Sequence, residues 1–472
     1  MGHVARLATL TTIGTAELPD AVARSVELRV LDIVGLCLAA TRLETSMAVA
    51  EVVRQQGTSD KATAIGAGRT SVASAAFMNG VLAHSLDYDD THLPSVLHPS
   101  ASVVPAVLAV AEELGVPGER LVPAIAAGLE ICVRLGMAGY DRATGNSIFF
   151  EHGQHATSIC GAVGAAAAAA ALHGPAPDAQ LVADAMGIAV SMASGVIEAN
   201  RTGGTVKRIH CGWAAQSGVM AAQLAAAGIT GPPTALEGRF GFFQAFLRGS
   251  YDEAALLDGL GVEWEVPSIF FKPYPANHFT HTIVDAARRL RAAGLRPEDV
   301  ESVRVGVPTP VVRTVGEPLE AKRAPLTGYQ AQFSAPYAVA VGLFGGGGLG
   351  ACLDDYSDAL ATHPARRALM ATVHVEGDAR CDKVFPHQFP AVLTVHTRDR
   401  RVLEEAVLVN RGGPQDPLSE DELCRKFRGN SAAVLEPHVS TEVERRVLSL
   451  REATNARAIM QLLSSVPTAV RP

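Results

Sequence analysis

Apolar residues recur at three- and four-residue spacing from about Leu18 to about Gly228. This is the period of a helix that buries one face. Seven segments follow the pattern and end at or near glycine or a polar turn: AELPDAVARSVELRVLDIVGLCLAA, SVASAAFMNGVLAHSLDYDD, SASVVPAVLAVAEELG, LVPAIAAGLEICVRLGMA, HATSICGAVGAAAAAAALHG, DAQLVADAMGIAVSMASG and GWAAQSGVMAAQLAAAGI. Several are apolar on nearly every side, which predicts burial. We therefore expect a helical bundle with central helices.

The pattern changes near Pro267, where aromatic residues gather in WEVPSIFFKPYPANHF. A helix, HTIVDAARRLRAAG, is followed by segments with the alternation of strands: ESVRVGVPT, TVHVEGD, FPAVLTVHTRD and RRVLEEAVLVN. Helical spacing returns from PLSEDELCRKF onward. The sequence thus predicts a mainly α protein, in which a large all-helical domain (residues 1–266 and 411–472) carries an inserted, smaller α/β lid domain (residues 267–410).

Composition narrows the class of protein. The 472 residues are 48% hydrophobic and 19% charged, which is typical of a globular chain with large cores. The net charge of -8 and the lack of a long basic run argue against nucleic acid as a partner. The apolar run from Gly161 falls short of the roughly 20 residues that a membrane span needs, so we expect a buried helix packed through small side chains.

Two further features predict a cytoplasmic location. Seven cysteines are scattered without a CxxC pair, which favours reduced thiols over a disulfide framework. The N-terminal residues lack the continuous apolar stretch of a signal peptide.

Ionisable side chains gather in LDYDDTHLPSVLHPS, residues 86–100. If the preceding helix runs from Ser74 to about Asp90, then Asp87 and Thr91 share one face near its C-terminal end. Carboxylates are disfavoured there by the helix dipole, so they need another role. His98 falls just before the next helix, where an imidazole facing a carboxylate is suited to proton transfer. The alternative is a solvated loop.

Three other stretches carry candidate chemistry. His155 in EHGQHATSICG precedes a run of small residues. It is either a functional group or an ordinary half-buried histidine at a helix start. Lys207 and His210 in TGGTVKRIHCGWAAQSG lie three residues apart before a helix, which suits anion binding, although a solvated lysine has the same pattern. Lys272 in FFKPYPANHFTH lies among aromatics and prolines, either with a task or with its stem covering those rings.

Two patterns are weaker. GGGGLG at residues 345–350 matches GxGxxG but lacks a convincing acidic residue about 20 positions on, which favours a flexible loop over dinucleotide binding. The Asp/His cluster at residues 87–98 has loose spacing for a divalent metal, and HExxH is missing.

Taken together, the motifs resemble the MmgE/PrpD superfamily over about residues 18–460. The resemblance is carried by NGVLAHSLDYDDTH, HPSASVVPAVLA, VKRIHCGWAAQSGVMAAQLAAAGITGP, LEGRFGFF and KPYPANHFTHTIVDAA. The superfamily includes 2-methylcitrate dehydratase, cis-aconitate decarboxylase and iminodisuccinate epimerase. The resemblance implies a homodimer of two-domain subunits that works without metal or organic cofactor on a small carboxylate substrate.

The resemblance also implies which residues form the site. His98 and His155 match the positions expected to move protons, with Asp87 orienting or charging one of them. The resemblance gives Thr91, Lys207 and Lys272 as substrate ligands. His210 and Tyr337 (in FSAPYAVA) are added because their residue types can also bind a substrate. Tyr337 is equally suited to packing in a core. Such groups are suited to three reactions: decarboxylation of a cis-aconitate-type substrate, dehydration of a 2-methylcitrate-type substrate, and epimerisation of a dicarboxylate. We favour the decarboxylation. A protein that only binds carboxylates is the alternative from another class.

Overall fold

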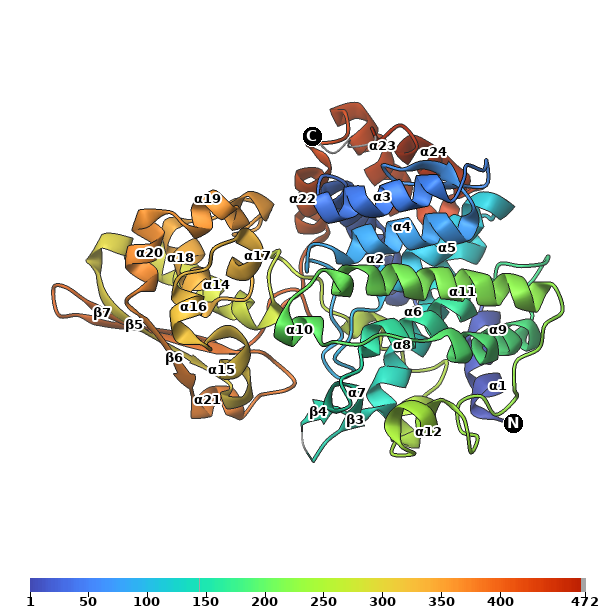
Figure 1. Cartoon of the computed structure of the whole chain (residues 1–472), viewed down its shortest axis with the longest axis horizontal. Coiled ribbons are helices and arrows are strands. Elements are labelled where there is room, and N and C mark those ends of the chain that lie inside the picture. Colours follow the sequence, from blue (N-terminus) through green and yellow to red (C-terminus); the bar gives the residue numbers. More distant parts are fainter. Residues whose placement is uncertain (144, 468–472) are drawn as a thin grey trace. The chain divides into compact units, whose positions relative to one another are not determined.

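The structure is a computed structural model that describes residues 1–143 and 145–467. It is mostly helical (56%), with a small mixed sheet in the C-terminal region, which confirms the predicted fold class. The chain forms two compact units (Figure 1). The first contains Met1–Ile269 and the residues from Phe427 onward, and the second contains Phe270–Lys426.

The first unit is a helical bundle. Its main helices are α1 (His3–Ala8), α2 (Asp20–Ala40), α3 (Glu44–Gln55), α4 (Val72–His84), α5 (Ser100–Leu114), α6 (Gly118–Ala138), α8 (Ala156–Ala170), α9 (Ala179–Met192), α11 (His210–Ala226), α23 (Pro437–Leu448) and α24 (Arg457–Leu463). Short helices and two small hairpins connect them: β1 (Ala62–Ala64) with β2 (Gly68–Thr70), β3 (Tyr140–Asp141) with β4 (Asn146–Ser147), α7 (Ile148–Glu151), α10 (Ala199–Thr202), η2 (Val206–Ile209), α12 (Phe242–Leu247) and α13 (Glu253–Leu257).

Helix α8 forms the centre of this bundle, where it packs against α5, α6, α9 and α11. All of its residues are buried, as its alanine-rich sequence predicted. Small residues allow this packing, because a Cβ atom placed on Gly164 would lie 2.5 Å from the Gly128 carbonyl oxygen of α6. Among the described residues, one helix, α6, is long and apolar enough to cross a membrane, and 94% of its apolar window is buried inside the protein.

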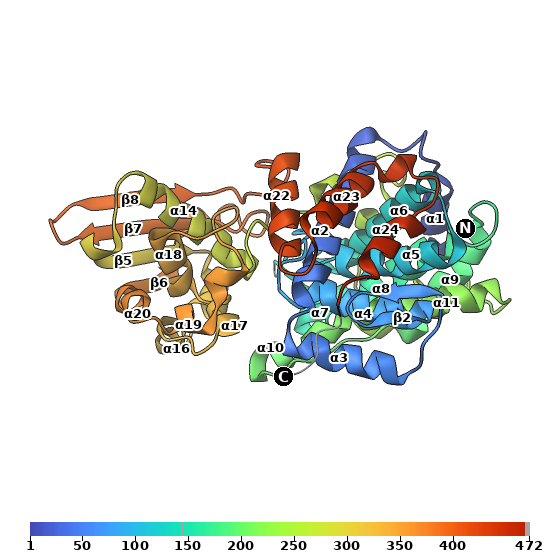
Figure 2. The same cartoon turned by 90° about the horizontal axis from the view of Figure 1, so that it is seen from above.

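The second unit contains a four-stranded sheet with the order β6-β5-β7-β8, which can be followed in Figure 2. Its strands are β5 (Val300–Val307), β6 (Val373–Gly377), β7 (Ala391–Thr397) and β8 (Val402–Val407). β5 pairs with β6 in parallel, and the other two pairs are antiparallel. Helix α14 (His281–Ala292) packs on β7 and β8, and α18 (Ala335–Phe344) packs on α14.

Smaller helices complete the second unit: α15 (Thr309–Val315), α16 (Leu319–Arg323), α17 (Gly328–Ala331), α19 (Asp358–Ala361), α20 (Pro364–Met370) and α21 (Ala379–Asp382). The chain then enters α22 (Glu420–Ser431). The second unit extends to Lys426, beyond the boundary expected at residue 410. Hydrogen bonds tie the residues just past that boundary to the second unit: Phe271 N–H donates to the Gly412 carbonyl (2.9 Å), and Arg411 donates to the Leu349 carbonyl (3.0 Å).

Candidate active site

The loop of residues 85–99, called the acidic loop below, follows α4 directly. Helix α4 ends at His84, so the expected helix to Asp90 is too long, and Asp87 and Thr91 do not share a helix face. The chain turns because Asp87 adopts a φ of 52°, in the left-handed region. Aspartate tolerates this conformation better than most residues. After the turn, Asp89 lies back at the end of α4, with its Oδ2 2.7 Å from His84 Nδ1.

A buried ion pair anchors the acidic loop. Arg29 Nη1 of α2 lies 2.9 Å from Asp90 Oδ2, and both side chains are at most 2% exposed. The same carboxylate accepts hydrogen bonds from the hydroxyl and the backbone N–H of Ser100 at the start of α5. Burial raises the pKa of Asp90, and the Arg29 charge opposes that rise. Asp90 therefore ties the loop that carries Asp87, Thr91 and His98 to α2 and to the start of α5.

His98 is half-buried at the end of the acidic loop. Its Nδ1 lies 2.5 Å from the Asp90 carbonyl oxygen and 3.2 Å from Thr91 Oγ1. Because a carbonyl only accepts, Nδ1 carries a proton, and Nε2 is the nitrogen that can exchange one in a neutral ring. The His98 backbone N–H donates to Thr157 Oγ1 of α8 (3.2 Å), which ties the loop to the central helix.

His155 and His210 form a second part of the site. His155 is the N-cap of α8 and His210 is the first residue of α11, so both flank helix starts, as expected. Their Nδ1 atoms lie 2.9 Å apart. One of these two nitrogens must accept the hydrogen bond, so the two rings cannot both be doubly protonated. Burial, with the nearby charges of His84 and Lys207, lowers the pKa of His155 well below its usual value and that of His210 to about 4.

His84 connects these histidines. Its ring centroid lies 5.6 Å from that of His98 and 5.8 Å from that of His155, while the His155 and His210 centroids are 4.9 Å apart. His84 Nδ1 also lies 2.7 Å from Asp89 Oδ2. These four residues, His84, His98, His155 and His210, are called the histidine cluster below.

Lys207 supplies a positive charge beside the cluster. It lies in the short helix η2, three residues before His210. Its Nζ is 3.6 Å from Asp87 Oδ1, and the two side chains are 17% and 8% exposed. Of the residues predicted from the sequence, Asp87, Thr91, His98, His155, Lys207 and His210 therefore come together around one site.

Tyr337 and Lys272 belong to the second unit. Tyr337 is fully buried, donates its hydroxyl to the Asp355 carbonyl (2.5 Å) and accepts from Arg366 (3.0 Å). These bonds occupy the hydroxyl within the core, so its expected role as a substrate ligand is withdrawn. Lys272 is 1% exposed, and its expected role stays a prediction.

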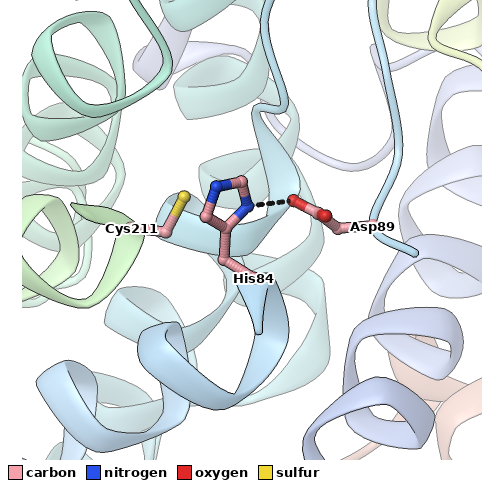
Figure 3. Close-up of side chains that lie close together, drawn as sticks. All are labelled: His84, Asp89 and Cys211. Atoms are coloured by element: carbon pink, nitrogen blue, oxygen red, sulfur yellow. Dashed lines mark hydrogen bonds and ion pairs between the residues drawn. The ribbon is translucent and has the colours of Figure 1, made fainter. Parts of the chain in front are cut away.

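His84, Asp89 and Cys211 could offer ligand atoms to a metal ion, since these atoms all lie within 4.8 Å of one another (Figure 3). All three are buried. The donor set fits such an ion poorly: His84 Nδ1 already bonds the carboxylate, and burial raises the pKa of the Cys211 thiol, which favours the protonated form.

Sequence reasoning missed His84, Asp89 and Asp90 as members of the site. The spacing HSLDYDD contained a signal, because a turn after a helix returns a residue five positions on to the helix end. Their partners, however, lie up to about 130 positions away along the chain, which periodicity does not reveal.

A helical bundle that gathers histidines, a lysine and carboxylates in this way has the groups that acid/base chemistry uses. The chain matches the MmgE/PrpD N-terminal domain over residues 6–254 and the MmgE/PrpD C-terminal domain over residues 274–451. It therefore belongs to the MmgE/PrpD family, a family of lyases with decarboxylase and dehydratase members, and the resemblance is confirmed.

Curated relatives are similar over most of the chain. Cis-aconitate decarboxylase of Homo sapiens is 29% identical over 408 residues, covering 82% of this chain and 79% of the relative. Cis-aconitate decarboxylase of Aspergillus terreus is 26% identical over 474 residues, covering 96% of this chain and 94% of the relative. A cis-aconitate decarboxylase-like protein of Aspergillus oryzae is 27% identical over 410 residues, covering 83% of this chain and 82% of the relative.

Proposed function

We propose that this protein is a cofactor-independent lyase that decarboxylates a small tricarboxylate of the cis-aconitate type. The observation that carries the proposal is the convergence of His98, His155 and Lys207 from three separate segments on one buried cluster. The names of the relatives support decarboxylation over the dehydration that the family also contains.

Substrate binding follows from charge. Lys207 is the cation of the site, and Asp87 holds its side chain in place at 3.6 Å. A substrate carboxylate that reaches Lys207 gains a charge-assisted hydrogen bond in surroundings with little water, where such bonds are strong. The resemblance adds Lys272 as a second cation, and Thr91 as a hydroxyl donor.

The reaction needs one proton delivered to carbon. When the bond between a carboxylate and the CH2 carbon of cis-aconitate breaks, its electron pair moves into the allylic system and carbon dioxide leaves. An acid then protonates the new carbanion at carbon, which gives itaconate. His98, whose Nδ1–H is held by the Asp90 carbonyl, delivers this proton from Nε2 as an imidazolium and is left as the neutral ring, and the neutral His155 orients or assists it.

The test is proton NMR of the EDTA-treated protein with cis-aconitate, 2-methylcitrate and iminodisuccinate in D2O. Itaconate formed from cis-aconitate supports the proposal. A dehydrated product from 2-methylcitrate, or deuterium entering carbon without net reaction, replaces it with a hydro-lyase or an epimerase.

Two variants connect the activity to the site. His98→Gln is expected to lower kcat by about 10²–10⁴-fold, the range for loss of a positioned acid or base. His173→Gln, at a half-buried histidine after α8, is the control and retains activity. If no substrate is turned over and His98→Gln leaves ligand affinity intact, the protein is a carboxylate-binding protein instead.

A further inference from the structure

The second unit contains a cavity of about 290 Å³ beside helix α14 and the end of strand β8. The two elements pack against each other, as can be followed in Figure 2. Helix α14 lines the cavity with one face, from which Asp285, Arg288, Arg289 and Ala292 project. The volume is close to the lower end of the range for small-molecule sites, about 300–1,000 Å³. Every lining residue belongs to the second unit, whereas the histidine cluster belongs to the first.

Two of the guanidinium groups that line the cavity are held by a buried hydrogen-bond network. Tyr274 is fully buried, and its hydroxyl donates to Asp285 Oδ1. The same hydroxyl accepts from Arg288 Nη1 (2.8 Å) and from Arg411 Nη1 (3.4 Å). Arg411 Nη1 also donates to the Leu349 carbonyl (3.0 Å). Both guanidinium groups are therefore in place before a ligand arrives, which lowers the entropic cost of binding one.

The arginines of α14 keep donors that the protein does not use. A guanidinium has five N–H groups. Among the described residues, Arg288 donates only from Nη1, and Arg289 donates only from Nη1, to Glu405 (3.1 Å). The Nε and Nη2 groups of both side chains are therefore left to solvent or to a ligand. Two such groups on one guanidinium can hold a carboxylate through parallel hydrogen bonds.

The charges that line the cavity favour an anion. Three lining arginines exceed the two lining aspartates, Asp285 and Asp416, by one charge, and Asp285 is buried in the network described above. Two glutamates outside the lining balance part of this charge, in the pairs Arg289–Glu405 and Arg411–Glu422. The first pair is 54% and 28% exposed, and exposed pairs contribute little to stability, so a ligand can compete for Arg289.

The rest of the wall is apolar. Ala292, Val407 and Val409 line the cavity without a polar side-chain atom. An inorganic anion such as phosphate gains nothing from these groups, whereas the carbon chain of an organic acid is removed from water when it covers them. The wall therefore favours a carboxylate with an apolar chain over an inorganic anion.

We propose that this cavity is a binding site for a small organic acid with one carboxylate and a short apolar chain. The carboxylate accepts from the Nε and Nη2 groups of Arg288 and Arg289, and the chain lies against Val407 and Val409. The site stands apart from the proposed function, because no residue of the histidine cluster takes part in it.

Saturation-transfer NMR of the full chain with pentanoate measures the binding, with acetate and inorganic phosphate for comparison. Pentanoate is expected to bind more tightly than acetate, because only its chain is long enough to cover the valines. Phosphate at equal concentration is expected to leave pentanoate bound. Equal affinity for acetate, or displacement by phosphate, would overturn the assignment to an organic acid.

Two variants locate the ligand. Arg289→Gln removes a largely exposed charge and should retain the fold, and we expect the Kd for pentanoate to rise about tenfold or more. Ala292→Glu places a negative charge at an exposed position of the lining and should abolish binding. Arg291→Gln is the matched control, since it removes the same charge from the same helix at a residue that does not line the cavity. An unchanged Kd in both Arg289→Gln and Ala292→Glu would overturn the site.

Lys207→Met separates this cavity from the histidine cluster, which has Lys207 as its own cation. The variant is expected to leave the Kd for pentanoate unchanged. A Kd that rises in Lys207→Met and not in Arg289→Gln would place the carboxylate at the histidine cluster and overturn the site in the second unit. Neither result requires turnover of cis-aconitate, so a failure of the proposed function leaves this test intact.

Discussion

At the residue scale, the site depends on backbone carbonyls and buried charges that fix where each proton can lie. The Asp90 carbonyl holds the proton of His98 on Nδ1, and only one of His155 and His210 carries its proton on Nδ1, because the other Nδ1 accepts in their contact. Lys207 adds a fixed charge. The cluster is therefore prepared for an anionic substrate before any substrate arrives.

Lys207→Met is expected to raise the KM for cis-aconitate by about tenfold or more, because a charge-assisted hydrogen bond contributes about 1.5–3 kcal/mol. Lys207→Arg restores part of the affinity. The measurement is initial-rate kinetics for both variants. The control is Lys61→Met, since Lys61 is likewise 3.6 Å from a carboxylate, that of Glu113, but more exposed at 56%. A KM equal to wild type in Lys207→Met would exclude this lysine from binding.

Residue types in the sequence marked candidates for the site, and the resemblance gave most of them their roles. Asp87, Thr91, His98, His155, Lys207 and His210 were all named in this way, since ionisable side chains in loops and beside helix starts often carry function. His84 and Asp89 were not, because a histidine inside an apolar helix and one aspartate among three resemble ordinary core and loop residues. Their pairing requires the turn at Asp87, where a positive φ ends the helical course.

At the element scale, the position of the site depends on how closely α8 approaches its neighbours. His155 begins α8 and Thr157 anchors the acidic loop, so a shift of this helix would move both sides of the cluster. The close approach to α6 requires glycine, since a Cβ atom on Gly164 would meet the Gly128 carbonyl oxygen at 2.5 Å.

Gly164→Ala is expected to lower the free energy of unfolding by about 1–3 kcal/mol, the range for an overpacked core. Urea titration measures it. Gly429→Ala in α22 is the matched control, because no atom lies within 4 Å of the added Cβ, and alanine there should stabilise by up to about 1 kcal/mol. If both variants show the same change, the α6–α8 contact is not the constraint.

The spacing of apolar residues predicted helices and strands correctly where a single helical or strand pattern ran through the whole segment. The central helix α8 and the strands β5, β6, β7 and β8 appear where the sequence placed them. One error lies at a helix end: α4 stops at His84, six residues before the expected end. The positive φ of Asp87 ends the helical course there, and the local pattern of residue types does not reveal it.

At the scale of the whole molecule, buried histidines make stability depend on pH. An unfolded histidine has a pKa near 6.5, whereas burial lowers the pKa of His210 to about 4. Between these values the unfolded chain binds the proton and the folded chain does not, so stability is lost as the pH falls. His155 acts in the same direction, and Glu130, whose pKa burial raises to about 7, acts in the opposite one.

His210→Gln isolates one of these contributions. The melting temperature of the variant is expected to fall less steeply than that of wild type between pH 6.5 and pH 4, with a difference that grows by roughly a few degrees. Scanning calorimetry across that range measures it, and the other groups cancel in the difference. Parallel curves for the two proteins would contradict the depressed pKa.

The resemblance implies a homodimer, and one apolar stripe on the first unit is a candidate for its interface. Val206, Trp213 and Met220 are 46%, 44% and 37% exposed, and the spacing of seven residues places Trp213 and Met220 on one side of α11. Large apolar groups in such a stripe are typical of contacts with a second copy. Since η2 also carries Lys207, a dimer through this stripe would stabilise the site itself.

Light scattering is expected to give about twice the chain mass of 49.2 kDa for the wild type. Trp213→Glu places a charge in the stripe and should yield a protein with the mass of one chain, because a buried unpaired charge at an interface is costly. Phe240→Glu is the control, since Phe240 is 87% exposed but lies outside the stripe. A Trp213→Glu protein that keeps the doubled mass would place the interface elsewhere, and a wild type with the mass of one chain would refute the dimer.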